Sequence, residues 1–385
     1  MSGTVETNVF SLNKLYQLVV DGQVRYDAPD GDIWVWGSNF CGSFGINSTN
    51  GCLSPIAIPG LWSQAVAGTY VSLARKTDNT LWTWGQNNFG QLGTNNTIER
   101  SSPIQVPGTS WVDISTGGRN LTDSCTMSLA RKSDGTLWAW GNNLRGQLGL
   151  NDRVSRSSPV QIPGTSWVEA FAGAGIAGAR KSDNTLWVWG FNCLGQLGLN
   201  DIISRSSPVQ IPGTNWTQIS TRSIYNMAAR KSDGTLWVWG DSSNRALPFS
   251  DSISRSSPTQ VPGTSWVDVS FAGQPTRSVG LALKSDGTLW TWGANDCGQL
   301  GTNDGISRSS PIQIPGTSWV TGVATQMYRG ASAAARKSDG TLWMWGDGEK
   351  MGQGDIISRS SPVQVPGNGW KSVSIGERHV LAIGR

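Results

Sequence analysis

Residues 132–167 read KSDGTLWAWGNNLRGQLGLNDRVSRSSPVQIPGTSW, and close copies of this stretch recur along the sequence. Its central phrase, an apolar residue followed by Trp-x-Trp-Gly, occurs seven times at a mean spacing of about 51 residues, which is in the range of propeller blades. The first tryptophans of these copies are Trp34, Trp82, Trp138, Trp187, Trp237, Trp290 and Trp343. This regularity predicts one array of similar units, although 385 residues could otherwise make two or three domains.

A second phrase, Pro-Gly-Thr-Ser-Trp or close to it, adds a third tryptophan to each repeat. All 21 tryptophans therefore belong to the repeats, and the additional seven are Trp62, Trp111, Trp167, Trp216, Trp266, Trp319 and Trp370. Side chains alternate along a strand, so both indoles of Trp-x-Trp point to the same face. We expect the indoles to form a core between neighbouring sheets, not a glycan-binding platform.

Each repeat is typical of four short strands. In the third repeat we expect strands at 112–115, 127–131, 136–140 and 159–162, with a hairpin turn at Asp134-Gly135. Pro159 would begin the last strand, at an outer edge where a missing hydrogen-bond donor is tolerated. The fold class predicted is all-β, a seven-bladed β-propeller of four-stranded antiparallel blades whose closure removes free sheet edges.

The first and last segments of the repeat array each supply only part of a blade, and this predicts a composite blade. The C-terminal part ends with strands at 373–374 and 379–383, whereas the first repeat enters directly at its Trp-x-Trp strand. We therefore expect residues 30–385 to form the propeller and residues 1–29 to form an N-terminal arm. The arm contains LYQLVVDGQVRY, which could make a hairpin that turns at Asp21-Gly22; a rival interpretation places Val24–Tyr26 in the composite blade as its second strand.

The composition argues against catalysis and against a cofactor or metal. His379 is the one histidine, and we expect it to be a structural hydrogen-bonding residue. The sequence has no zinc, phosphate-loop or metalloprotease motif. Calcium needs six to eight converging oxygens, so we expect the recurring loop aspartates to cap their own loops instead; these are Asp152, Asp201, Asp304 and Asp355.

Two sets of arginines recur. One set belongs to the Arg-Ser-Ser-Pro phrase: Arg100, Arg156, Arg205, Arg255, Arg308 and Arg359. The other precedes a lysine: Arg75, Arg131, Arg180, Arg230 and Arg336. A ring of cations could meet phosphates or acidic glycans, but an Asp follows each arginine of the second set closely, and we expect local pairing. A net charge of +4 makes nucleic acid an unlikely partner.

The cellular setting is predicted from what the sequence lacks. Five cysteines, an odd number, argue against a disulfide framework, and we expect free thiols. No apolar run is long enough for a membrane span, and the first residues lack the features of a secretory signal.

The motif Gly-x-Asn-x-x-Gly-Gln-Leu-Gly, at 85–93, 141–149, 190–198 and 293–301, resembles the regulator of chromosome condensation repeat. The resemblance covers about residues 31–385 and implies a seven-bladed propeller. The family's Gly-x-x-His survives once, at 376–379, and the residues at 244–248 and 350–354 depart from Gly-Gln-Leu-Gly. In the near-identity of its repeat sequences, the chain is also similar to repeat proteins of bacteria and phages.

We expect partners at the end of the ring where loops vary, since variable loops on a rigid scaffold usually carry binding. The candidates are Arg119, Asn120, Asp123, Arg222, Tyr225, Gln274, Arg277, Gln326, Tyr328, Arg329 and Arg378. The arm could dock by adding to a neighbour's sheet edge. Its candidate residues are Leu15, Tyr16, Leu18, Val20, Val24 and Tyr26.

The leading hypothesis from the sequence is a non-enzymatic scaffold of a phage virion, held to a capsid or tail protein by its arm. A soluble regulator that binds a GTPase or chromatin is the alternative, although neither a nucleotide-exchange wedge nor basic tails are evident. A lectin that binds a cell-surface glycan or receptor is the third possibility. We expect the protein in the virion or otherwise in the cytoplasm.

Overall fold

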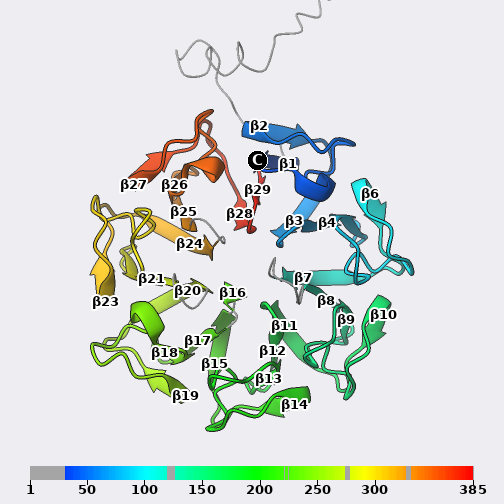
Figure 1. Ribbon diagram of the computed structural model, residues 1–385, viewed down its shortest axis with the longest axis horizontal. Coiled ribbons are helices and arrows are strands. Elements are labelled where there is room, and N and C mark those ends of the chain that lie inside the picture. The colour runs from blue at the N-terminus through cyan, green and yellow to red at the C-terminus, as the bar shows by residue number, and fades with distance from the viewer. Residues whose placement is uncertain are drawn as a thin grey trace, which may run out of the picture.

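The strands form a closed ring of seven sheets (Figure 1). The computed structural model describes residues 31–118, 126–220, 222–223, 225–273, 278–326 and 331–384. Within these residues six sheets have four strands, and one has a fifth because β16 (Arg222–Ser223) pairs in parallel with β20. The predicted seven-bladed propeller is confirmed.

Each blade has four antiparallel strands ordered from the centre outward. The first strands are β3 (Trp62–Ala67), β7 (Trp111–Gly117), β11 (Trp167–Ala172), β15 (Trp216–Ser220), β20 (Trp266–Gly273), β24 (Trp319–Gln326) and β28 (Ser372–Ile375). The second strands are β4 (Val71–Lys76), β8 (Met127–Lys132), β12 (Ile176–Lys181), β17 (Asn226–Lys231), β21 (Val279–Lys284), β25 (Ala331–Lys337) and β29 (His379–Ile383).

The third and fourth strands complete the blades. The third strands are β5 (Leu81–Gly85), β9 (Leu137–Gly141), β13 (Leu186–Gly190), β18 (Leu236–Gly240), β22 (Leu289–Gly293), β26 (Leu342–Gly346) and β1 (Ile33–Gly37). The fourth are β6 (Arg100–Gln105), β10 (Arg156–Gln161), β14 (Arg205–Gln210), β19 (Arg255–Gln260), β23 (Arg308–Gln313), β27 (Arg359–Gln364) and β2 (Cys52–Ile58). Three short 3-10 helices, η1 (Phe40–Gly42), η2 (Ser243–Arg245) and η3 (Gly348–Lys350), lie after third strands.

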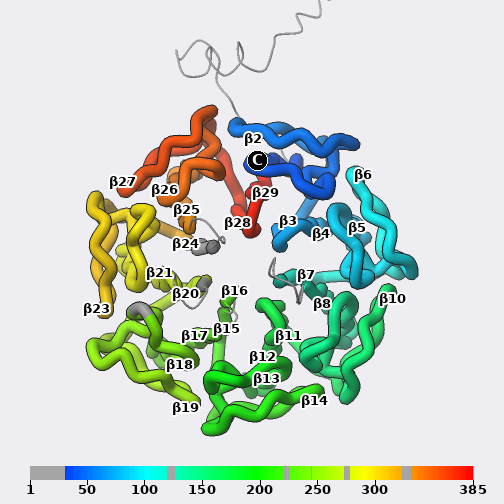
Figure 2. The backbone as a smooth tube through the Cα atoms, in the orientation of Figure 1, coloured from blue at the N-terminus to red at the C-terminus, as the bar shows by residue number. Residues whose placement is uncertain are grey.

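The composite blade is confirmed, and it joins the two ends of the described chain (Figure 2). Its order is β2-β1-β29-β28, and β1 pairs with β29 from Ile33 opposite Ile383 to Gly37 opposite His379. The rival interpretation, with Val24–Tyr26 as the second strand, is wrong because β29 holds that place. The arm candidates themselves lie outside the described residues.

The core lies in the seams between blades. Each of seven buried clusters combines residues of two neighbouring blades; one, for example, joins Met127 and Leu129 of β8 to Ala177 and Ala179 of β12. The tryptophan at or just before the first strand and the second tryptophan of Trp-x-Trp are both buried in every blade. The expectation that all indoles are core needs one correction, because the first tryptophan of Trp-x-Trp is only half-buried in six blades.

The Gly-Gln-Leu-Gly loop ties each blade to the next. The indole N–H of Trp140 donates to the Gln91 carbonyl across one seam, at 2.9 Å, and the Trp189 indole donates to the Gln147 carbonyl across the next, at 2.8 Å. One seam lacks this bond: the buried Nε1 of Trp292 has no partner among the described residues. That seam follows the loop at 244–248, which the sequence marks as a departure from the motif.

The position of the proline in the outer strand also differs from the prediction. β10 begins at Arg156, so Pro159 is its fourth residue and not its first. The pairing register with β9 shifts between Arg156 and Val160. This irregularity accommodates a residue that cannot donate to the ladder.

Candidate functional site at the loop end of the ring

The two ends of the ring differ in their connections. In the blade of β11–β14, the inner loop 173–175 and the outer loop 191–204 lie at one end, and the turns 182–185 and 211–215 lie at the other. We call these the loop end and the turn end. In every blade the inner loop joins the first two strands, and the outer loop joins the last two.

The described part of the predicted partner surface is small. Tyr225 is half-buried, and its N–H donates to the Ser223 hydroxyl at 3.2 Å. Arg378 is half-buried beside Tyr70, whose pKa is raised chiefly by burial. The backbone of Arg222 pairs with Ala272, and Gln326 ends β24. The remaining candidates lie outside the described residues: Arg119, Asn120, Asp123, Gln274, Arg277, Tyr328 and Arg329.

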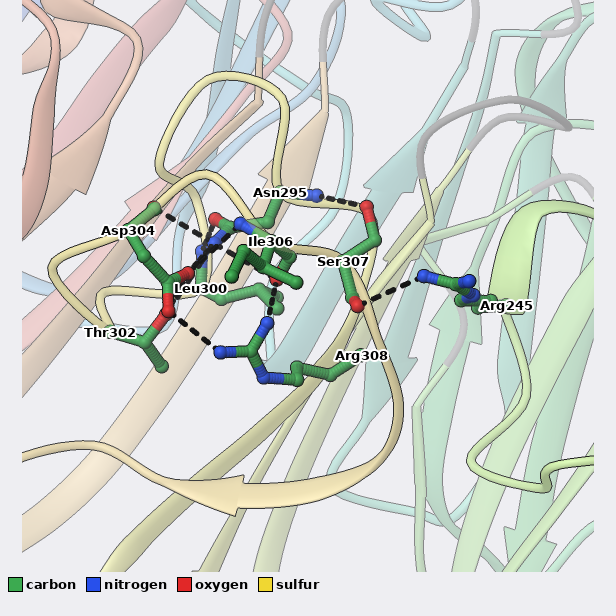
Figure 3. Close-up of polar contacts among 8 residues, drawn as sticks. All are labelled: Arg245, Asn295, Leu300, Thr302, Asp304, Ile306, Ser307 and Arg308. Carbon is green, nitrogen blue, oxygen red and sulfur yellow. Dashed lines mark hydrogen bonds and ion pairs between the residues drawn. The ribbon is translucent and has the colours of Figure 1, made fainter.

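The outer loops are held by a repeated network of polar contacts (Figure 3). In the blade of β22 and β23, the Arg308 Nη2 atom lies 2.7 Å from the Asp304 carboxylate, which also accepts from the Ile306 N–H at 2.9 Å. The Ile306 N–H and other donors, Arg308 among them, lower the pKa of Asp304. The Asn295 amide donates to the backbone carbonyls of Asp304 and Ile306. The backbone on both sides of Ile306 is therefore fixed.

The same pairing occurs four residues apart in five blades. The ion pairs are Arg156–Asp152, Arg205–Asp201, Arg255–Asp251, Arg308–Asp304 and Arg359–Asp355. The expected capping role of the loop aspartates is confirmed, and their arginine partners are those of the Arg-Ser-Ser-Pro phrase. The sequence carried this signal as a recurring Asp-x-x-x-Arg spacing, which the sequence analysis overlooked.

Six of the outer loops display an apolar side chain to solvent at the same position, another feature the sequence analysis missed; some of these loops expose a second one, such as Ile202 or Ile356. The residues at the shared position precede Ser-Arg or Glu-Arg and are between 57% and 62% exposed. They are Ile98, Val154, Ile203, Ile253, Ile306 and Ile357. The composite blade has Asn50 at this place, since the Asn39 amide donates to the Asn50 carbonyl as the Asn87 amide does to that of Ile98. We call these six residues the apolar ring.

The second set of arginines does not pair as predicted. Asp78 accepts instead from the N–H and the hydroxyl of Thr80, whereas Arg75 donates to the Asn79 side chain at 2.7 Å. Arg180 pairs with Glu169, at 3.1 Å, and not with the aspartate that follows it. The threonine two residues after the aspartate donates two hydrogen bonds to the carboxylate, and the carboxylate therefore does not pair with the arginine.

The turn end is built from these same short-range contacts. The Trp82 indole N–H donates to Thr80 Oγ1, and Lys76 Nζ lies 4.3 Å from the centre of the Trp82 ring. Equivalent threonine bonds and lysine–tryptophan contacts recur in five further blades. These residues stabilise the half-buried indoles.

The centre of the ring holds a cavity of about 290 Å³ lined by first strands. Three carboxylates reach it: Asp113 accepts from the Gln64 amide at 3.0 Å, Asp268 accepts from the Gln218 amide at 2.5 Å, and Glu169 pairs with Arg180. Burial raises the pKa of Glu169 to about 7, although Arg180 opposes the shift, and burial also raises the pKa of Asp113. The two glutamine–aspartate contacts join neighbouring blades, whereas the Glu169–Arg180 pair lies within one blade.

His379 is a structural residue, as the sequence analysis expected. The Ser72 hydroxyl donates to the Ser43 carbonyl at 2.7 Å, so His379 Nε2–H donates to Ser72 Oγ at 2.8 Å. The other ring nitrogen, Nδ1, is buried and has no partner among the described residues. Burial and the nearby Lys350 lower the pKa of His379 to about 3.

The described residues contain no group of three or more histidine, cysteine or acidic side chains able to hold a metal. Four cysteines within the described ranges, Cys41, Cys52, Cys193 and Cys297, are free. No helix in the same ranges is long and apolar enough to cross a membrane.

Comparison with known proteins identifies the repeats. The family model described as the regulator of chromosome condensation (RCC1) repeat matches residues 78–121, 134–179, 183–221, 286–325 and 339–383, and a second model of the same description matches residues 62–91. Together these matches cover more than half of the chain.

Two curated relatives match part of the chain. The ultraviolet-B receptor UVR8 of Arabidopsis thaliana is 31% identical over 27% of the chain and 24% of its own length. The RCC2 homolog of Danio rerio is 31% identical over 26% of the chain and 21% of its own length. The matched segments thus span about a quarter of these relatives.

Solved structures share the architecture over nearly the whole chain. Human WBSCR16 has a TM-score of 0.79 at 21% identity, covering 94% of this chain and 99% of its own. Prp20p of Saccharomyces cerevisiae, whose structure was described with its binding to Gsp1p and histones, has a TM-score of 0.77 at 18% identity, covering 99% and 96%. At these identities the likeness establishes the fold alone.

Proposed function

The chain belongs to the regulator of chromosome condensation repeat family, and from that premise we propose that it is a non-enzymatic, protein-binding regulator that engages its partner with the loop end of the ring. The observation that carries the proposal is the apolar ring. Six solvent-exposed aliphatic side chains are held at this end on loops whose backbones are already fixed. Such pre-ordered contacts bind without the entropic cost of ordering a loop.

The charge pattern supports a protein partner over nucleic acid. Five of the six arginines beside the apolar ring are paired with aspartates, so these five loops present little net charge. Nucleic-acid surfaces depend on unpaired cations that neutralise phosphates. Prp20p was described with a protein partner, Gsp1p, and with histones, and these classes are the first candidates for this chain.

The test is binding to a GTPase of the Gsp1p type loaded with fluorescent GDP, and to histones, measured by anisotropy and by nucleotide release. We expect one of the two to bind. Replacing the six residues of the apolar ring with Asn, the residue already present at position 50, should weaken binding about tenfold or more. A control variant makes the same replacement at Leu61, Val267 and Val320, which are exposed in first strands or at the turn end.

The proposal is wrong if neither probe binds, or if both variants bind equally well. The virion hypothesis depends on the arm, which lies outside the described residues, and none of the relatives named above is a virion protein. It is tested by deleting residues 2–25 and measuring incorporation into particles. The lectin hypothesis is tested on a glycan array.

A further inference from the structure

The outer strand of the composite blade has lost the polar residues that the other six outer strands share. β2 reads CLSPIAI, whereas the others begin Arg-Ser-Ser-Pro and end in Gln. Aligned on Pro55, Cys52 replaces the arginine, Leu53 replaces a serine and Ala57 replaces the exposed glutamine. Edge strands are normally protected from further pairing by charged residues and Pro. β2 keeps only its proline.

One part of this edge is already occupied. The Gly354 N–H, from the outer loop of the preceding blade, donates to the Leu53 carbonyl at 3.2 Å. The same tie recurs in other seams, for example from the Asn95 N–H to the Ser157 carbonyl at 2.7 Å. In the regular part of the β1–β2 ladder Ile58 lies opposite Ile33. In another blade the equivalent Val106 N–H donates inward to the Leu81 carbonyl. Backbone groups alternate between the two sides of a strand, so those of Ala57 face the outer side. The stretch 55–58 extends this edge towards the turn end.

The chain before β1 starts beside that stretch. The Trp62 N–H donates to the Gly31 carbonyl at 2.8 Å, and the Gly60 N–H donates to the Asp32 carboxylate at 2.9 Å. Gly60 lies just after the end of β2. Neighbouring strands are about 4.8 Å apart, so the distance from β1 to the outer side of β2 is about 10 Å. The five residues 27–31 can span about 17 Å, which is sufficient.

We propose that Val24–Tyr26 of the same molecule pair with the outer edge of β2 at residues 55–58 and form a fifth strand of the composite blade. These residues have the alternation of a strand and lie directly before the linker. The second-strand place is held by β29, which leaves the outer edge as their place in this blade. The arm then covers an apolar edge of its own ring, and this role is independent of the function proposed above.

The test is amide hydrogen exchange of the full chain and of a variant lacking residues 2–26, each read at the fragment covering 52–58. Pro55 has no N–H, so the Ala57 amide is the reporter on this edge. We expect the Ala57 amide to exchange at least tenfold faster without the arm. The corresponding fragment 205–210 of β14 should not change, because the proposed pairing involves β2 alone and β14 belongs to another blade.

A point variant separates pairing from general damage. Val24→Pro should accelerate Ala57 exchange as the deletion does, whereas Ser11→Pro, upstream of the predicted hairpin, should not. The proposal is overturned if exchange at β2 is unaffected by the deletion or by Val24→Pro. It is also overturned if protection appears only at high protein concentration together with a dimer in sedimentation, since the strand would then come from a second copy.

Discussion

At the scale of single residues, two ionisable groups lie at the seams of the composite blade, where water does not reach. His379 and Lys350 are both fully buried. His379, on β29, contacts Ser72 of the following blade, and Lys350 belongs to η3 of the preceding blade. The Trp36 indole donates to the Lys350 carbonyl at 2.8 Å, and the Lys350 ammonium donates to the Glu377 carbonyl at 3.4 Å. Because the pKa values of both groups are shifted by burial, the stability of the protein should depend on pH in acid, through His379, and in base, through Lys350.

His379 should make stability fall in acid. The unfolded chain takes up a proton near pH 6.5, whereas the folded chain does so only near its pKa of about 3, so unfolding is favoured as the pH drops through this range. We expect the free energy of unfolding of the wild type to decrease by about 1.4 kcal/mol per pH unit relative to His379→Asn between pH 6 and 4. Asn226 occupies the same position in another blade, opposite the glycine of its Trp-x-Trp-Gly.

The measurement is urea unfolding followed by tryptophan fluorescence at pH 4, 5, 6 and 7. Ser72→Ala serves as the control, because it removes the hydrogen bond but keeps the imidazole and its titration. Parallel pH profiles for the wild type and His379→Asn would contradict the assignment.

Lys350 should act in the opposite pH range. Burial lowers its pKa from 10.5 to about 8, so the folded chain loses this proton before the unfolded chain does, and stability rises as the pH increases from 8 to 10.5. Lys350→Gln introduces the residue found at this point of four other loops and removes the buried charge. We expect it to stabilise the protein at pH 7 by up to about 3 kcal/mol.

This gain should shrink towards pH 10.5, where the wild-type lysine is neutral. Unfolding curves at pH 7 and pH 10 measure it, and Lys371→Gln, at an exposed position, is the control. A gain of the same size at both pH values would mean that packing, not charge, is responsible.

At the scale of elements, the seam in which the Trp292 indole lacks its hydrogen bond depends on three coupled residues. Pro248 stands where other loops have a glycine with φ near +70°, such as Gly149 and Gly198, and proline cannot adopt that angle. The Trp292 indole consequently lies over Gly280, where an added Cβ would be 2.0 Å from Trp292 Cε2. The matching residues opposite Trp189 and Trp345 are alanines, so the glycine compensates for the displaced indole.

We therefore expect Gly280→Ala to destabilise the protein by about 2 kcal/mol, because the methyl group collides with the indole. In a chain that also carries Ala246→Gln and Pro248→Gly, Trp292 can bond to the loop as in other seams, and the same change should cost less than about 0.5 kcal/mol. A double-mutant cycle from denaturant unfolding measures this coupling. Additive effects would contradict it, and Ala177→Gly reports the ordinary cost at a regular seam.

Much at this scale could be predicted from sequence, because the signals are local. The Asp-Gly turns and the alternation of Trp-x-Trp locate the strands, and the altered wording at 244–248 marks the irregular seam. The pairing of Arg75 was mispredicted because Asp78 is satisfied within its own turn by Thr80, a competition between neighbours that spacing alone does not rank. Lys350 gave no sign of burial, since it contacts Glu377 and Trp36, which are 27 and 314 positions away in the sequence.

At the scale of the whole molecule, closure rests on a sheet built from both ends of the chain. β29 lies between β1 and β28, and Leu381 and Ile383 belong to the same core cluster as Ile33 and Val35. Blades interact chiefly with their neighbours, as units do in other repeat proteins, so an opened ring resembles a short solenoid with two exposed faces. The closed form gains one further seam and buries both faces.

Removing residues 372–385 should therefore convert one cooperative unfolding transition into a broad transition at lower denaturant concentration. The remaining blades can still form, but the composite sheet retains only β1 and β2, and two seams lose their apolar contacts. Near-ultraviolet circular dichroism follows the packing of the indoles, and a peptide of residues 370–385 added in trans should restore both the signal and the cooperativity. Deleting Arg385 alone is the control. A truncated chain that unfolds at the wild-type midpoint with the same steepness would mean that the ring does not depend on its closing strands.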